Sequence, residues 1–340
     1  GNERATSGIG AFLSKTTPAT PVSDVLPPVL WSIARPMTLN PTQSVLRADI
    51  LWGAGLMVIF SLLAPVQDTL VKLATDHVSS GVIAFSRFFI QALILVPLVA
   101  LRWGPSRLWP QRAPHLHALR GVLMATLTVM FTIALESMYV ADAIAIFFVE
   151  PMIVTLLGGL ILREQVGWRR YVACAVGFVG ALLVIQPSFE ELGWVAFLPL
   201  GVALLFSIYL ILTRQLAQHE EPVAMQAYTG VTGLVFLGAI LMVLDPLGST
   251  TFALTPPSPY ALMLLGGMGL IATFNHLLLV QAFRRAPASV LAPIQYLEIV
   301  TGVLLGWMIW AYVPNALKWT GIAIIVASGL YIVWRESRRS

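Results

Sequence analysis

Long apolar runs, separated by short polar segments, dominate the chain from Asp49 onward. Each run is close to the roughly 20 residues that an α-helix needs to cross a bilayer. Lipid offers no water to backbone polar groups, so runs of this kind are expected to be helices. Ten spans are predicted, at approximately residues 50–72, 80–101, 117–138, 141–163, 168–187, 194–214, 223–244, 259–283, 287–311 and 316–335. The pattern predicts an all-α polytopic membrane protein.

Residues 1–49 have a different pattern, rich in Ser, Thr, Pro and Gly. The one apolar patch there, at residues 25–37, is interrupted by prolines, so no span fits. The patch also lacks the uninterrupted apolar core of a signal peptide. We predict a mobile tail, with contact between this tail and the membrane surface as the alternative.

One apolar stretch that contains an acid occurs twice. Residues 141–164 align with residues 289–312 when the sequence is shifted by 148 residues. In this register Glu150 falls on Glu298. A matching acid inside two apolar helices indicates a duplicated unit.

The two copies are predicted at residues 50–187 and 194–336, with five spans each. Because five is odd, the second copy must lie upside down in the membrane relative to the first. The charges fit this inversion: the third span ends near Glu136, whereas the eighth ends at Arg284 and Arg285. Inverted repeats are typical of alternating-access transporters, whose binding site lies between the repeats.

Basic residues set the predicted orientation, because Lys and Arg gather on the cytoplasmic side of a membrane. If both termini are cytoplasmic, most of the basic residues fall on that side, including Arg102, Arg107 and Arg112 after the second span. Lys72 and Lys318 fall toward the other side. We expect a multi-pass protein of the inner membrane with both termini in the cytoplasm.

Composition agrees with lipid as the solvent and excludes several classes of protein. Hydrophobic residues make up 58% of the chain and charged residues 11%, against about 25% charged in soluble domains. The net charge of +4 is scattered over short loops, so no nucleic-acid partner is expected. Cys174 is the single cysteine, which excludes a multi-cysteine metal site. No P-loop or other enzyme motif is present, so we predict no catalytic residues, metal or cofactor.

Several segments resemble a known family. AFSRFFIQALILVPLVAL at residues 84–101, EPMIVTLLGGLILRE at 150–164 and APIQYLEIV at 292–300 are similar to the EamA branch of the drug/metabolite transporter superfamily. Within it they resemble bacterial members related to the S-adenosylmethionine uptake transporter. The resemblance implies ten helices, cytoplasmic termini and a secondary carrier that hydrolyses no ATP. One departure is Ile299, which stands where the first copy has Pro151. Whether the second copy contains a hinge is therefore left open.

Two acids are the sharpest candidates for function. An acid at the centre of a bilayer costs about 2.5 to 3.5 kcal/mol on insertion scales. We expect Glu150 and Glu298 to line a central cavity, where they bind a cationic group of the substrate or carry a coupling proton. The alternative is a static pair with Arg87 or with a backbone amide that fixes helix packing. Arg87 itself could hold a substrate carboxylate bidentately, or it could be a structural lock.

Other polar or aromatic residues inside the spans are also predicted to line the cavity. They are Gln67, Asp68, Tyr209, Tyr228, Asn275, His276, Gln295 and Tyr296. Two of them have simpler alternatives. Asp68 could be satisfied by Lys72 one helical turn later, and His276 could make a hydrogen bond between helices.

The sequence therefore predicts a secondary active transporter of a small polar or zwitterionic metabolite, working by alternating access. Substrates of this class include amino acids, nucleoside-like compounds such as S-adenosylmethionine, and organic acids. An exporter of amphipathic compounds is the main alternative, followed by a channel or scramblase and a membrane-embedded enzyme. The expected partners are the substrate and the lipid bilayer, and a homodimer is left open.

Overall fold

The computed structural model describes five stretches of the chain. They are residues 43–110, 112–161, 168–216, 220–286 and 288–337. Within these stretches there are helices and no strands, which confirms the all-α class. Most of the predicted tail lies outside the described residues, and the first described helix begins at Gln43, before the predicted start at residue 50.

The described elements are twelve α-helices and two short 3₁₀ helices. In chain order they are α2 (Gln43–Thr75), α3 (Ser80–Trp103), η2 (Pro105–Leu108), α4 (Pro114–Ser137), α5 (Val140–Phe147), α6 (Glu150–Ile161), α7 (Trp168–Leu192), η3 (Gly193–Phe197), α8 (Leu198–Leu216), α9 (Pro222–Leu244), α10 (Pro259–Arg285), α11 (Ala288–Gln295), α12 (Leu297–Trp310) and α13 (Ala316–Ser337). Polar caps mark two of the starts: Ser79 accepts a hydrogen bond from the Val82 amide, and Ser258 accepts one from the Ala261 amide. Such caps satisfy amides that the first helical turn leaves free.

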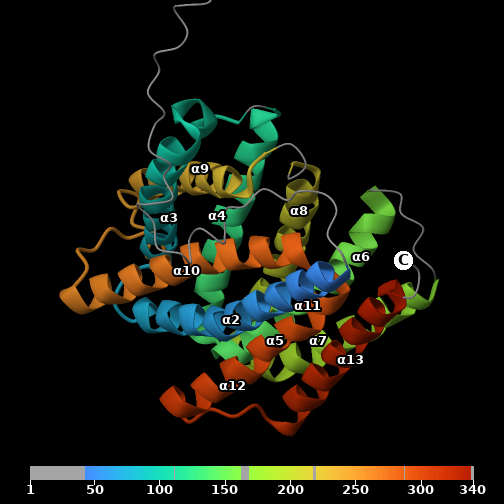
Figure 1. The fold of residues 1–340 in the computed structure, drawn as a ribbon. Coiled ribbons are helices and arrows are strands. Elements are labelled where there is room, and N and C mark those ends of the chain that lie inside the picture. The colour runs from blue at the N-terminus through green and yellow to red at the C-terminus, as the bar shows by residue number, and fades with distance from the viewer. Residues whose placement is uncertain (1–42, 111, 162–167, 217–219, 287, 338–340) are drawn as a thin grey trace, which may run out of the picture. The chain divides into compact units, whose positions relative to one another are not determined.

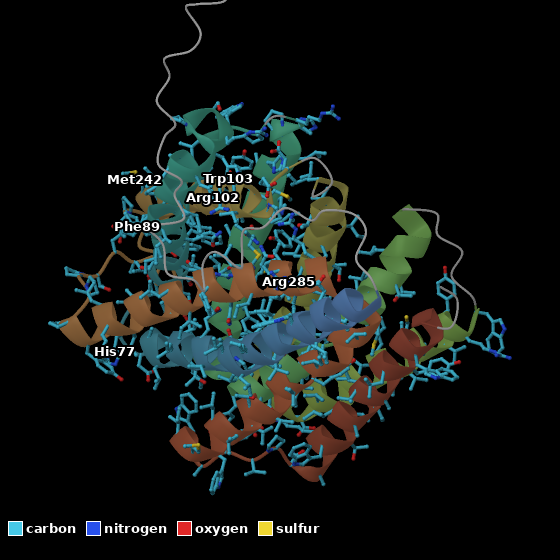
Figure 2. All side chains as sticks on the ribbon, in the orientation of Figure 1. His77, Phe89, Arg102, Trp103, Met242 and Arg285 are labelled. Atoms are coloured by element: carbon cyan, nitrogen blue, oxygen red, sulfur yellow. The ribbon has the colours of Figure 1, made fainter. Side chains whose placement is uncertain are left out.

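Seven helical segments of the described residues are long and apolar enough to cross a membrane, and three shorter apolar helices accompany them. The shorter ones are Tyr171–Gln186, Leu297–Trp310 and Ala316–Ile332. Large apolar side chains also face outward. Phe89 of α3 and Met242 of α9 are 47% and 78% exposed, and Figure 2 shows them at the periphery. Such a surface requires lipid around it, so the chain is a multi-span membrane protein.

Two predicted spans are broken rather than continuous. The span predicted at 141–163 divides into α5 and α6 just before Glu150, and the span predicted at 287–311 divides into α11 and α12 at Tyr296. Proline fits the first turn of a helix but not its interior, so Pro151 accounts for the first break. The second break occurs although no proline stands at the equivalent position.

Helices distant in sequence pack side by side. α2 lies along α10, α7 along α13, and α3 along α9 (Figure 1). α12 packs against both α2 and α5. The loop after α9 folds back onto the start of α3, where the Gly81 amide donates to the Thr251 carbonyl at 2.8 Å. These contacts bring α2 to α6 against α8 to α12 and enclose a space between them.

Candidate functional site

A cavity of about 430 Å³ lies among these helices. Its walls come from α2, α3, α4, α5, α6, α8, α10, α11, α12 and α13, so both predicted copies contribute. Eight of the residues predicted from the sequence line it. They are Gln67, Asp68, Arg87, Glu150, Asn275, His276, Gln295 and Glu298.

The helix breaks position the two aligned acids. Glu150 is the first residue of α6, and Glu298 is in the first turn of α12. The first turn of a helix carries free amides and the positive end of the helix dipole, both of which favour a carboxylate. In the described part of the chain no side chain or backbone amide donates a hydrogen bond to either carboxyl. Both groups are therefore available to a ligand.

Arg87 lies buried in the same cavity, with 7% of its surface exposed. Its Nη1 donates to Thr128 Oγ1 at 2.6 Å, and its Nη2 lies 2.5 Å from His276 Nε2. A guanidinium has no acceptor, so His276 Nε2 must accept and its imidazole is neutral. Among the described residues, no cavity carboxyl comes within the 4.0 Å of Arg87 that defines an ion pair.

Two polar side chains on the cavity wall make one long hydrogen bond or none with neighbouring residues. Asp68 accepts a long hydrogen bond of 3.5 Å from Gln67. Asn275 is 2% exposed, and neither of its amide atoms has a partner among the described residues. Lys72 Nζ donates to the Leu135 carbonyl at 2.7 Å, and in the described residues it forms no ion pair with Asp68.

Two tyrosines that were predicted to line the cavity lie elsewhere. Tyr209 is buried, and its hydroxyl accepts a hydrogen bond from Arg120 Nη2 at 2.7 Å. Tyr228 is also buried, and its hydroxyl donates to the Arg107 carbonyl at 2.7 Å. Neither lines the cavity. A helix turns by about 100° per residue, so a small error of register between the copies is enough to move a side chain to another face.

The aromatic wall is instead made of phenylalanines, which the sequence reasoning missed. Phe147 lies at its centre, with ring centroids 6.3 Å from Phe131 and 5.4 Å from Phe206. Tyr296, which was also predicted to line the cavity, does not line it, and its ring centroid lies 5.0 Å from that of Phe148. The full set that lines the cavity is Phe60, Phe131, Phe147, Phe148, Phe206 and Phe283. In a chain this apolar, phenylalanines facing a cavity and phenylalanines facing lipid have the same sequence signature.

A polar cluster lies where the starts of α5 and α13 meet. Lys318 Nζ, at the start of α13, lies 2.7 Å from Asp142 Oδ2, at the start of α5. The Tyr312 hydroxyl donates to the same oxygen at 2.6 Å, and its ring stacks on Tyr139 with centroids 3.6 Å apart. Burial, together with the charge of Asp142, raises the pKa of the Tyr312 hydroxyl. Tyr312 therefore stays protonated and keeps this hydrogen bond.

The arrangement defines a class of protein. Acids, an arginine and an aromatic wall converge on one enclosed space among membrane-crossing helices. Within the described residues no group of three or more His, Cys, Asp or Glu side chains could hold a metal ion. Polar groups kept at membrane depth mark the pathway of a substrate or an ion, so this arrangement is the one expected of a membrane transporter.

The chain belongs to the EamA-like transporter family, which matches residues 50–186 and 193–334. Membership confirms the predicted family and the prediction of a transporter of small metabolites that is not an enzyme.

Relatives of known name match most of the chain at similar sequence identities. The riboflavin transporter of Rhizobium johnstonii is 30% identical over 304 residues, which cover 89% of this chain and 96% of the relative. The S-adenosylmethionine uptake transporter of Rickettsia bellii is 28% identical over 289 residues, covering 84% and 94%. A solved crystal structure matches with a TM-score of 0.58 at 15% identity, over 86% of this chain and 99% of that one. That likeness concerns the fold alone.

Proposed function

We propose that this protein is a secondary transporter that carries a small zwitterionic or polar metabolite across the inner membrane by alternating access. The cavity is the substrate site, and two inverted five-span repeats move about it. The observation that carries the proposal is the position of Glu150 and Glu298. Both acids line one cavity, at the starts of half-helices on two broken spans.

Three further observations support the duplication. The family matches the chain twice, at bounds close to the predicted repeats. The break at Phe148 and Val149 and the break at Tyr296 fall at equivalent positions in the register that aligns the acids. Seven long spans and three shorter apolar helices also fit ten crossings. Broken helices at the repeat interface are the sites where inverted-repeat transporters bind their substrates.

The polar cluster supports alternating access. Asp142 belongs to the first proposed repeat, and Lys318 and Tyr312 belong to the second. Their contacts join the repeats at one end, while the cavity extends toward Leu210 and Phe283, near the other ends of α8 and α10. With both termini in the cytoplasm, the joined end is the outer one. The geometry fits an inward-facing carrier, closed at the outer side, with its substrate site directed toward the cytoplasm.

The lining indicates a substrate with both a ring and charges. Phenylalanine faces offer stacking area for a planar ring, while Arg87, Asp68 and the two aligned acids recognise charged groups. Riboflavin and S-adenosylmethionine, which name the relatives, each combine a nitrogen heterocycle with polar substituents. A ring-bearing polar metabolite is therefore the substrate class proposed here.

Counterflow in proteoliposomes tests the function. Vesicles containing the purified chain are preloaded with an unlabelled candidate, and entry of the labelled form is followed. The panel consists of S-adenosylmethionine, riboflavin, nucleosides, amino acids and di- and tricarboxylates. We expect saturable counterflow with a ring-bearing member and none in empty vesicles. Absence of counterflow for the whole panel contradicts the proposal, and flux without saturation indicates a channel.

Topology is tested separately with reporters. A reporter inserted near Arg107 and one fused after Arg339 are expected to report the cytoplasm, whereas one at residues 248–256 is expected to report the opposite side. Cytoplasmic reporting from residues 248–256 contradicts the ten-span inverted arrangement.

A further inference from the structure

Carboxyl groups outnumber cationic groups on the cavity wall. Its titratable lining residues are Asp68, Arg87, Glu150, His276 and Glu298. His276 is neutral because its Nε2 accepts from Arg87. When the three carboxyls are ionised they face a single guanidinium, which leaves an excess of negative charge in the cavity.

Arg87 is also poorly placed to neutralise any of the acids. Two of its nitrogens are directed to Thr128 and His276, at 2.6 Å and 2.5 Å. In the described residues the buried ion pair is that of Asp142 with Lys318, at the outer cluster. An unmatched charge in a buried site is costly, and a charge of opposite sign that enters the site relieves the cost. A cation brought by the ligand would meet this requirement.

The rest of the wall suits a cation that cannot donate hydrogen bonds. Aromatic faces attract such ions through their quadrupole, without any need for a donor. Six phenylalanines surround the cavity, and Phe147 meets Phe131, Phe148 and Phe206 within 6.3 Å or less between ring centroids. Carboxylates and aromatic faces together form an environment that favours sulfonium and substituted ammonium groups.

We propose that the cavity selects ring-bearing metabolites with an excess of positive charge, such as sulfonium compounds, over neutral ring compounds of similar size. The proposal rests on the proposed function and narrows its substrate class. Asp68, Glu150 and Glu298 supply the selectivity, and the phenylalanine wall holds the ring and the cation.

Two probes isolate the charge. S-adenosylmethionine and S-adenosylhomocysteine share the adenosine, ammonium and carboxylate groups and differ by the methyl that makes the sulfur a cation. Binding of each, and of riboflavin, is measured by titration calorimetry on the purified full chain. We expect S-adenosylmethionine to bind at least about tenfold more tightly than S-adenosylhomocysteine or riboflavin.

Variants then assign the selectivity to residues. Asp68→Asn, Glu150→Gln and Glu298→Gln are each expected to reduce the ratio between the two sulfur probes. Thr301→Val, one helical turn after Glu298 on α12 and outside the cavity lining, is the matched control and should keep the ratio. A ratio that all three carboxyl variants leave unchanged assigns the selectivity elsewhere and overturns the roles given to these acids.

The outcomes separate this inference from the function on which it rests. Equal binding of the two sulfur probes, or tighter binding of riboflavin, overturns the charge selectivity while counterflow of the bound compound leaves the transporter intact. Because this comparison uses the wild-type chain, it stands even if a variant fails to fold. Absence of binding and counterflow for every probe overturns both.

Discussion

Lys318 Nζ lies 2.7 Å from Asp142 Oδ2, and their side chains are only 8% and 3% exposed. The two residues are 176 positions apart in the chain. Their pair ties α13 to α5, and Tyr312 at the end of α12 adds a hydrogen bond to the same carboxyl oxygen. The contact therefore joins the starts of α5 and α13 and the segment after α12.

Breaking this pair is expected to destabilise the protein. Asp142→Asn or Lys318→Met leaves the other charge buried without its partner, and such losses cost about 3 to 5 kcal/mol. The melting temperature in detergent should fall clearly for each, and less than additively for the double variant. Thr320→Ala, on an exposed face of the same helix, is the control. Unchanged melting of both single variants would show that the pair is energetically neutral.

The aligned acids are expected to affect transport more than folding. Glutamine keeps the shape of glutamate, so Glu150→Gln and Glu298→Gln should express and melt nearly as the parent does, whereas uptake should fall steeply. Uptake driven by a pH gradient is compared with counterflow, which needs no net proton movement. Loss of driven uptake alone assigns that acid to proton coupling, and loss of both assigns it to substrate binding. Parental rates in both assays would leave the acids as packing residues.

We expect Arg87 to bind the ligand as well as to stabilise the fold. Arg87→Gln removes the positive charge and should weaken binding of a carboxylate-bearing ligand far more than it lowers the melting temperature. Thr128→Val removes only one hydrogen-bond acceptor of Arg87 and should weaken binding less. Calorimetry and melting curves on the same samples provide the comparison. A matched loss of stability and affinity would mean that Arg87 is a structural lock.

Close contact between α7 and α13 predicts a strong effect at a glycine. A Cβ added at Gly321 would lie 2.6 Å from the Gly180 carbonyl oxygen. Gly321→Ala should therefore lower stability by about 1 to 3 kcal/mol, the usual cost of overpacking. At Gly266 of α10 an added Cβ meets nothing within 4 Å, so Gly266→Ala should be neutral or slightly stabilising. Equal melting temperatures of the Gly321→Ala and Gly266→Ala proteins would show that α7 and α13 can move apart without a loss of stability.

Much of the site could be predicted because charged or polar groups are conspicuous in apolar spans. Glu150 and Glu298 stood out for that reason, and both line the cavity. The same reasoning failed for Tyr209 and Tyr228, which are polar but also amphipathic. Their hydroxyls bind Arg120 and the Arg107 carbonyl instead.

Other features could not be predicted because they depend on contacts between distant segments. Nothing in the local sequence connects Asp142 with Lys318, which lies 176 positions away, and only the fold brings them together. The second copy has no proline at the position equivalent to Pro151, and Pro293, three residues before the break at Tyr296, indicates that break only approximately. Helices chosen by hydropathy alone are predicted as continuous rods, because hydropathy does not report where a helix breaks.

Alternating access requires that the end of the protein joined by the Asp142–Lys318 ion pair opens during each transport cycle. Tyr139 and Tyr312 stack across that end with ring centroids 3.6 Å apart, so cysteines at these positions should be joined by a short reducible crosslinker. Cys174 is the single native cysteine, and a Cys174→Ala background removes it.

The decisive measurement is counterflow by the Tyr139→Cys, Tyr312→Cys protein in proteoliposomes, before crosslinking, after crosslinking and after reduction. The single-cysteine proteins treated in the same way are the controls. If the two repeats alternate about the cavity, crosslinking abolishes counterflow and reduction restores it. Counterflow that continues at the full rate in the crosslinked protein would contradict alternating access through this end.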